Sequence, residues 1–282
     1  MRITFWGVRG SIAAPGPETA GVGGNTSCVE VVCGDTRLIL DAGTGIRQLG
    51  NALLGEGPLD ATLLLSHLHW DHIQGLPFFV PAYLPSTKLQ IVGSGGGAAA
   101  LREVLSTQMT APVFPVRLDE LGAELRLREV RSGESFQVGE ARVRVAKLNH
   151  PGGVLAYRIE HDGRSVVYAT DTEHYACVDP TLRALAEGAD VLIYDSQYTP
   201  EEYRGDAGRS KVGWGHSTYA AGAELARSAG VGRYVLFHHD PQRSDAGVAE
   251  VERRARELFA GSMAAREGAI LSLSPAAQAE AA

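Results

Sequence analysis

Three histidines and an aspartate lie within six consecutive positions of the chain, at His67, His69, Asp71 and His72. The chain has nine histidines in 282 residues, so this density indicates a shared chemical task rather than a polar loop rich in histidine by chance. In an extended segment, residues two apart point to the same side, so His67 and His69 can bind one ion together. Asp71 and His72 follow at a turn and can face a second ion. Imidazole and carboxylate suit Zn²⁺, and Mn²⁺ or Fe²⁺ are also compatible.

Four ligands cannot complete two metal sites, and the sequence offers three more candidates. His150, Asp171 and His238 each stand at the end of an apolar, β-branched segment. Strand ends that gather along one edge of a sandwich can bring such side chains together. The sequence therefore predicts a metal centre built from several strand ends.

Short apolar segments bounded by Gly, Pro, Asn and Asp are predicted to be strands. Helical periodicity is found in four segments, and Asp179 and the pair Ser217–Thr218 are good helix starts. The predicted strands are 2–8, 28–33, 36–40, 61–65, 88–92, 141–148, 154–160, 165–169, 190–194 and 233–237, and the predicted helices are 98–107, 180–187, 217–229 and 245–259.

The predicted strands fall into two groups, one on each side of the long middle segment, and helices follow several of them. This order favours two β-sheets packed face to face with helices outside, an α/β fold with a four-layer αββα sandwich. No repeat, linker or low-complexity tract divides residues 1–274, which are expected to form one domain. Residues 275–282 are rich in Ala, Gln and Glu and are expected to fray.

The formal net charge is −7, whereas proteins that hold long nucleic acids usually present a basic face. A stable long nucleic-acid partner is therefore not expected. No apolar run approaches the length of a membrane helix, and the start of the chain lacks the apolar region of a signal peptide. The three cysteines are scattered and are expected to be buried small hydrophobes, which fits the reducing cytoplasm.

The chain from about residue 3 to residue 273 resembles the metallo-β-lactamase superfamily, especially the branch of ribonuclease Z and the cyclic-phosphate phosphodiesterases. The resemblance also covers the opening Phe5–Ser11 and the Leu40–Gly45 turn. The matching ligand motifs are Ser66-His67-Leu68-His69-Trp70-Asp71-His72, Asn149-His150-Pro151 ahead of Leu155-Ala156-Tyr157, Ala169-Thr170-Asp171-Thr172, Gly215-His216-Ser217-Thr218, and Leu236-Phe237-His238.

The resemblance implies a role for each ligand candidate. His67, His69 and His150 would bind a first metal ion. Asp71, His72 and His238 would bind a second, and Asp171 would bridge the two. Asp41 resembles the buried carboxylate that orients ligand histidines, although it could also be a simple turn residue. His239 is a weaker candidate than its neighbour His238.

The same resemblance implies a hydrolytic mechanism. Two metal ions can hold a bridging water, lower its pKa and polarise a phosphoryl oxygen, so the nucleophile would be a bridging hydroxide. Asp71 is then both a ligand and a candidate proton acceptor. His216 is the candidate general acid. Asp195 stands where relatives of ribonuclease Z carry a glutamate that orients this histidine, and the shorter side chain leaves that pairing open.

Ribonuclease Z enzymes typically insert a tRNA-gripping arm between the motifs of His150 and Asp171. Here only residues 151–170 intervene, and they are expected to form two strands joined by an Asp162-Gly163 turn. The substrate is therefore expected to be a small phosphodiester, such as a cyclic nucleotide or another cyclic phosphate.

Residues 203–214 form a glycine-rich segment just before His216, and a substrate lid and a plain solvated loop are about equally favoured. Arg9 is a further guess for a phosphate contact. The run Gly93–Gly97 departs from phosphate-loop patterns and is expected to be a strand-to-helix turn. The lid would offer Tyr203, Arg204, Arg209, Lys211 and Trp214 to the substrate.

Three other functions compete with a cyclic-phosphate phosphodiesterase. The runner-up is a ribonuclease Z-like endonuclease that processes tRNA 3′ ends. A mononuclear iron redox enzyme of the same fold is disfavoured by the full second ligand set, and a silent binding protein by the intact site. Relatives of this branch are often dimers, so the resemblance also implies a homodimer.

Overall fold

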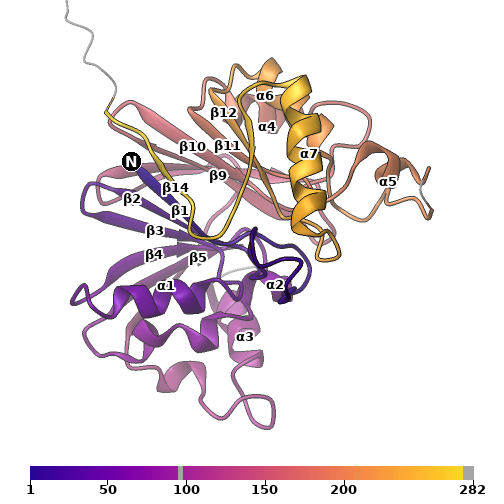
Figure 1. The fold of residues 1–282 in the computed structure, drawn as a ribbon. Coiled ribbons are helices and arrows are strands. Elements are labelled where there is room, and N and C mark those ends of the chain that lie inside the picture. The colour runs from indigo at the N-terminus through magenta and orange to yellow at the C-terminus, as the bar shows by residue number, and fades with distance from the viewer. Residues whose placement is uncertain (95–97, 207, 276–282) are drawn as a thin grey trace, which may run out of the picture.

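The computed structural model describes residues 1–94, 98–206 and 208–275, and it arranges the described strands in two seven-stranded sheets (Figure 1). The first sheet has the order β14 (Ile270–Ser272), β1 (Arg2–Gly7), β2 (Cys28–Cys33), β3 (Thr36–Leu40), β4 (Asp60–Leu64), β5 (Lys88–Gly93) and β6 (Glu124–Glu129). The second has the order β13 (Ser262–Ala264), β12 (Arg233–Phe237), β11 (Val191–Asp195), β10 (Arg164–Ala169), β9 (Val154–His161), β8 (Ala141–Leu148) and β7 (Ser135–Val138).

Helices cover the outer face of each sheet (Figure 1). α1 (Ile46–Leu53) and α3 (Ala98–Thr107) lie against the first sheet. α4 (Pro180–Ala186), α6 (Tyr219–Ser228) and α7 (Asp245–Leu258) lie against the second. The short helices are α2 (Trp70–Ile73), α5 (Pro200–Arg204) and the 3-10 turns η1 (Leu76–Phe78), η2 (Val80–Tyr83) and η3 (Leu118–Glu120).

Alternation along the strands separates the core into three layers. In β4, Leu63 packs toward α1, whereas Leu64 packs between the sheets. In β11, Ile193 packs between the sheets, whereas Leu192 packs toward the helices of the second sheet. Because successive strand residues point to opposite faces, each sheet must be covered on both sides. The predicted four-layer αββα sandwich is confirmed.

Parallel pairing brings several strand ends to one edge. β3, β4 and β5 pair in parallel, and so do β10, β11 and β12, so their carboxyl ends lie together in each sheet. The segments after β3, β4, β10 and β12 contain Asp41, His67, Asp171 and His238. The β9–β10 hairpin turns at Asp162 and Gly163, both with positive φ as an Asp-Gly turn requires.

Some element boundaries differ from the sequence prediction. The helix predicted over 217–229 begins at Tyr219, because Thr218 is its cap and accepts a hydrogen bond from the Ala221 N–H. Strands β6, β7, β13 and β14 were not predicted, because β7, β13 and β14 are short and β6 has only two apolar residues among four charged ones. Cys177 is exposed, contrary to the expectation of burial.

Two other expectations fall partly or wholly on residues outside the described ranges. The glycine run at 93–97 includes residues 95–97, and the tail at 275–282 includes residues 276–282. Among the described residues, no helix combines the length and apolar character needed to cross a membrane.

Candidate metal centre

The first donor group consists of His67, His69 and His150, which lie at the ends of β4 and β8. One ring nitrogen from each lies within 4.8 Å of the others, a spacing that allows all three to bind a single ion. The Nδ1 of His69 is 3.0 Å from the Nε2 of His150. Strand ends from two different sheets therefore meet at this group.

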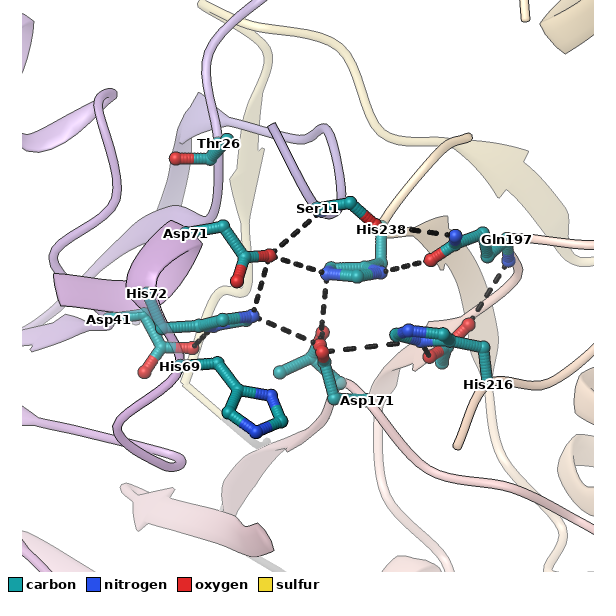
Figure 2. Close-up of polar contacts among 12 residues, drawn as sticks. Ser11, Thr26, Asp41, His69, Asp71, His72, Asp171, Gln197, His216 and His238 are labelled. Atoms are coloured by element: carbon teal, nitrogen blue, oxygen red, sulfur yellow. Dashed lines mark hydrogen bonds and ion pairs between the residues drawn. The ribbon is translucent and has the colours of Figure 1, made fainter. Parts of the chain in front are cut away.

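The second donor group consists of Asp71, His72, Asp171 and His238, all of them buried (Figure 2). The Oδ2 of Asp71 is 3.2 Å from the Nε2 of His72 and 3.4 Å from the Nε2 of His238. Asp71 and His72 belong to α2, whereas His238 follows β12 of the other sheet. The second group is therefore built from segments that follow strands of both sheets.

The two oxygens of Asp171 face different groups. Oδ1 lies 3.2 Å from His72 Nε2 and 3.0 Å from His238 Nε2. Oδ2 lies 3.7 Å from His67 Nε2 and 3.8 Å from His150 Nε2. This arrangement suits a carboxylate that bridges two cations.

The donor atoms are arranged to bind metal ions rather than to form hydrogen bonds with one another. His67 Nε2 is a buried ring nitrogen without a hydrogen-bond partner in the described structure, and burying such an atom unpaired costs free energy. His72 Nε2 is also buried and makes no well-aligned hydrogen bond, although two carboxylate oxygens lie 3.2 Å away. Despite the opposing effect of burial, the carboxylates of Asp171, Asp71 and Asp41 raise the pKa of His72 well above its ordinary value. The surroundings therefore require positive charge here, which a divalent cation would supply.

Asp41 fixes the ring of His72. Its Oδ2 lies 2.8 Å from His72 Nδ1 and accepts a hydrogen bond from the Tyr168 hydroxyl at 2.7 Å. Its Oδ1 accepts from the Ser66 N–H at 2.7 Å. The carboxylate is fully buried, and this contact leaves the Nε2 of His72 facing the second donor group. The geometry therefore matches the orienting role expected for Asp41.

Two other rings are oriented in the same way. The Nδ1 of His150 donates to the Gly215 carbonyl at 2.8 Å, and the Nδ1 of His238 donates to Gln197 Oε1 at 2.9 Å. A side chain at Gly215 would place its Cβ 2.4 Å from His150 Nδ1, so glycine is needed there. Gln197 was not anticipated, because a glutamine after a strand carries no distinctive sequence signal.

Three of these side chains are carried by strained backbone. Asp41, Asp171 and His238 have φ values of 62°, 49° and 59°. Such left-handed conformations cost free energy in residues other than glycine and persist where surrounding contacts hold them. Each lies within two residues of a strand end, and its side chain contacts or belongs to the donor groups.

His216 lies beside the second donor group (Figure 2), where it forms a buried pair with Asp195. The distance from His216 Nδ1 to Asp195 Oδ2 is 2.8 Å, so the shorter aspartate does reach the ring. The other oxygen, Oδ1, accepts from the N–H groups of Gln197 and Ser217, which fixes the carboxylate. Burial alone would lower the pKa of His216, but Asp195 outweighs it and raises this pKa to about 9.

Only part of the segment 203–214 reaches the centre. Trp214 borders the same opening as His69, Asp71 and His216, and it is partly exposed. Lys211 Nζ lies 3.9 Å from the Trp214 ring centroid, and the Arg209 guanidinium lies 5.7 Å away. Residue 207 lies outside the described ranges.

The structure does not bring the remaining predicted substrate contacts to the opening. Tyr203 is buried, and its hydroxyl donates to Glu173. Arg204 pairs with Asp206. Arg9 is fully buried, and its guanidinium donates to backbone carbonyls, including that of Gly23 at 2.8 Å. None of these three residues lines the opening at the donor groups, and their contact with substrate stays a prediction. The backbone of Arg9 lies beside His239, whose ring Nε2 donates to the Ala265 carbonyl and takes no part in the donor groups.

Glu173 is a residue of the centre that sequence analysis missed. Its buried carboxylate accepts from the Tyr203 hydroxyl at 2.6 Å, from the Gly213 N–H at 2.7 Å and from the Gly215 N–H at 2.9 Å. Gly215 in turn anchors His150. Glu173 therefore ties the loop that contains Asp171 to the loop before His216. A lone glutamate two residues after a metal-type aspartate gave no signal of this role.

Residues 36–239 match the family described as the beta-lactamase superfamily domain. A ribonuclease Z of Mycobacterium sp. (strain KMS) is 29% identical over 273 aligned residues, which cover 87% of this chain and 88% of the relative.

Solved structures share the fold at lower identity. The metallo-beta-lactamase fold protein YhfI from Bacillus subtilis aligns with a TM-score of 0.73 and 20% identity, covering 96% of this chain and 98% of the other. A diphosphatase of the PhnP family aligns with a TM-score of 0.71 and 18% identity, covering 97% of this chain and 98% of the other.

We expect the purified chain to bind two divalent cations, and Asp171→Ala to lose at least one of them because both donor groups use this carboxylate. Chelation should lower the melting temperature, since ions that bind only the folded state stabilise it. Elemental analysis and thermal melting measure both effects. The matched control is His161→Ala, because His161 lies at the far end of β9 beside Glu140. Full metal content in Asp171→Ala would contradict the shared role.

We expect Glu173→Ala to weaken the binding of the first cation by about tenfold or more, because His150 loses the anchored Gly215 carbonyl. Competition with a chromophoric chelator measures this affinity, and melting curves check the fold. Glu224→Gln removes an exposed acid from the neighbouring α6 and serves as the control. If Glu173→Ala and the control bound metal equally well, Glu173 would have no positioning role.

Proposed function

The chain belongs to the β-lactamase superfamily, and from this we propose that it is a metal-dependent phosphodiesterase that uses two divalent cations to hydrolyse a small phosphodiester. His67, His69 and His150 would hold the first cation, and Asp71, His72 and His238 the second, with Asp171 between them. Zinc is the proposed metal, because it binds well to imidazole nitrogens and carboxylate oxygens. Manganese or iron could replace it.

The observation that carries this proposal is the His216–Asp195 pair beside the bridging carboxylate. His216 Nδ1 lies 4.0 Å from Asp171 Oδ2, so the ring stands next to both donor groups. Its Nδ1 is held by Asp195, and the described residues offer Nε2 no hydrogen bond. A protonated imidazole in this position suits the departure of an alkoxide from phosphorus.

Each residue then has a defined task. Two bound cations would supply an activated water and polarise the phosphoryl oxygens. His216 would donate a proton from Nε2 to the leaving oxygen, and the carboxylate of Asp195 beside its Nδ1 favours the protonated ring. Asp195 would hold the ring and stabilise its charge. Asp71, whose Oδ2 accepts the Ser11 N–H at 2.8 Å, is fixed as a ligand and candidate proton acceptor.

A small cyclic phosphate or cyclic nucleotide is the proposed substrate. The β9–β10 hairpin fills residues 154–169, so the described chain has no inserted arm between His150 and Asp171 for gripping tRNA. The net charge of −7 also disfavours a long nucleic acid. Trp214, with Lys211 and Arg209 beside its ring, would contact the base or phosphate at the opening.

A ribonuclease Z-like endonuclease is the second candidate, because the mycobacterial relative of that name aligns along most of both chains. Both candidates use the same donor groups and His216. They differ in the size of the substrate outside the centre. A homodimer and a cytoplasmic location remain predictions from the resemblance and the composition.

We expect metal-loaded protein to hydrolyse bis(p-nitrophenyl) phosphate and cyclic mononucleotides. A precursor tRNA should bind weakly, because the net charge is −7. A nuclease would instead bind it with an affinity that falls steeply with salt. Release of p-nitrophenol, chromatography of nucleotides and filter binding across salt concentrations measure these outcomes. Inactivity on every diester with both cations bound would refute the proposal, and tight, salt-sensitive tRNA binding would favour the endonuclease.

We expect His216→Ala to slow turnover by about 100-fold or more while both cations stay bound, because a general acid is lost and no ligand is. Asp195→Asn should slow turnover less, since the ring stays in place without its carboxylate partner. Steady-state kinetics and elemental analysis of the same samples separate the two roles. His216, Asp195, Asp171 and His238 also lie close enough to share an ion, so loss of metal from His216→Ala would identify His216 as a ligand instead.

A further inference from the structure

A second cavity adjoins the candidate metal centre. It has a volume of about 500 Å³ and is lined in part by His67 and His69. It shares His69 and Pro151 with the opening that exposes Asp71 and His216. Figure 2 shows His69 on the side of the cluster away from Ser11, so the cavity continues the centre past the first donor group. A substrate bound at the centre can therefore extend into it.

The cavity combines an apolar lining with basic side chains. Its apolar residues are Leu68, Val130, Val154 and Leu155. Lys147, which is exposed at the end of β8, also lines it, and so does Arg131. A mostly apolar lining with a few charged groups is typical of pockets that bind small organic molecules.

The position of Lys147 is set by its neighbours. Its backbone N–H donates to Ser132 Oγ at 3.0 Å, which joins the end of β8 to the turn that contains Arg131. A Cβ on Gly153 would lie 2.9 Å from Lys147 Cε and 3.5 Å from Nζ. Gly153 also has a φ of +87°, which a larger residue would adopt only with strain. The glycine leaves room for the lysine beside the cavity.

The charge of Lys147 is not neutralised within the described structure, where no carboxylate lies within ion-pair distance of its Nζ. The guanidinium of Arg131 lies 3.9 Å from the carboxylate of Glu129, which is long for an ion pair, and Arg131 is largely exposed. This ion pair is therefore weak. Among the described residues that line the cavity, Glu129 is acidic, whereas Lys147 and Arg131 are basic. The cavity therefore carries a net positive charge next to the metal centre.

We propose that this cavity binds a second anionic group of the substrate, a phosphate monoester, through Lys147. The proposal rests on the proposed phosphodiesterase function, because it places the scissile phosphate at the candidate metal centre. The substrate class is then a nucleotide-sized phosphodiester that carries an additional terminal phosphate. The nucleoside packs on the apolar lining, and the terminal phosphate meets the ammonium group of Lys147.

The test compares two ligands that differ by one phosphate. Calorimetry on metal-loaded protein measures the affinity for thymidine 5′-monophosphate and for thymidine 3′,5′-bisphosphate. The bisphosphate should bind at least about tenfold more tightly, because a charge-assisted contact is added. Lys147→Ala should remove most of this preference. Lys88→Ala changes an exposed lysine at the opposite end of the neighbouring β5 and should keep it.

Equal affinity for the two nucleotides would overturn the proposal, and so would a preference that survives in Lys147→Ala. Melting curves establish that Lys147→Ala is folded, and Lys147→Glu provides a second variant in which the bisphosphate should bind more weakly than the monophosphate. Hydrolysis of bis(p-nitrophenyl) phosphate, which has no second anionic group, tests the proposed function separately. Its failure would refute the phosphodiesterase, whereas loss of the nucleotide preference alone would refute only this subsite.

Discussion

The centre depends on the carboxylate of Asp171, which lies between two sets of imidazole donors and is nearly inaccessible to solvent. A buried anion is costly unless cations or hydrogen bonds compensate it. Burial would raise its pKa, yet His238 and His72 hold the pKa of Asp171 well below its ordinary value. The fold accommodates this charge because segments that follow strands of both sheets place histidines beside it. The strain at positive φ is therefore the cost of placing one carboxylate between both donor sets.

The donor rings are held by contacts at their distal nitrogens. His72 is fixed by Asp41, His150 by the Gly215 carbonyl and His238 by Gln197. Each contact selects the tautomer that leaves the other nitrogen facing the centre. His216 follows the same rule with Asp195, and its ring lies beside the rings of His150 and His238 without belonging to either donor group. A hydrogen bond at Nδ1 thus orients the ligand histidines and the proposed general acid alike. They differ in where the ring lies.

Sequence analysis could predict the residues that carry chemistry, because histidine and aspartate at strand ends form an unusual pattern. The layers were predictable for a different reason, because buried strands such as 61–65 are apolar at all positions but one, Thr62. Contacts between loops were not predictable. Glu173 and Gln197 act through partners distant in sequence, and Arg9 and Tyr203 are occupied by loop contacts that spacing does not reveal. Edge strands such as β6 lack the apolar pattern because one side faces solvent.

The substrate lid predicted over 203–214 stays a prediction, and the structure shows how the two ends of this segment are anchored. Glu173 binds Gly213, Gly215 and the Tyr203 hydroxyl, so both ends of the described loop are tied to the segment that contains Asp171. A movement of this loop would break buried hydrogen bonds and release the carbonyl that orients His150. Trp214 is therefore held at the opening by the same contacts that build the metal centre. If the chain binds two cations as proposed, preorganised surfaces beside them would contribute to selectivity.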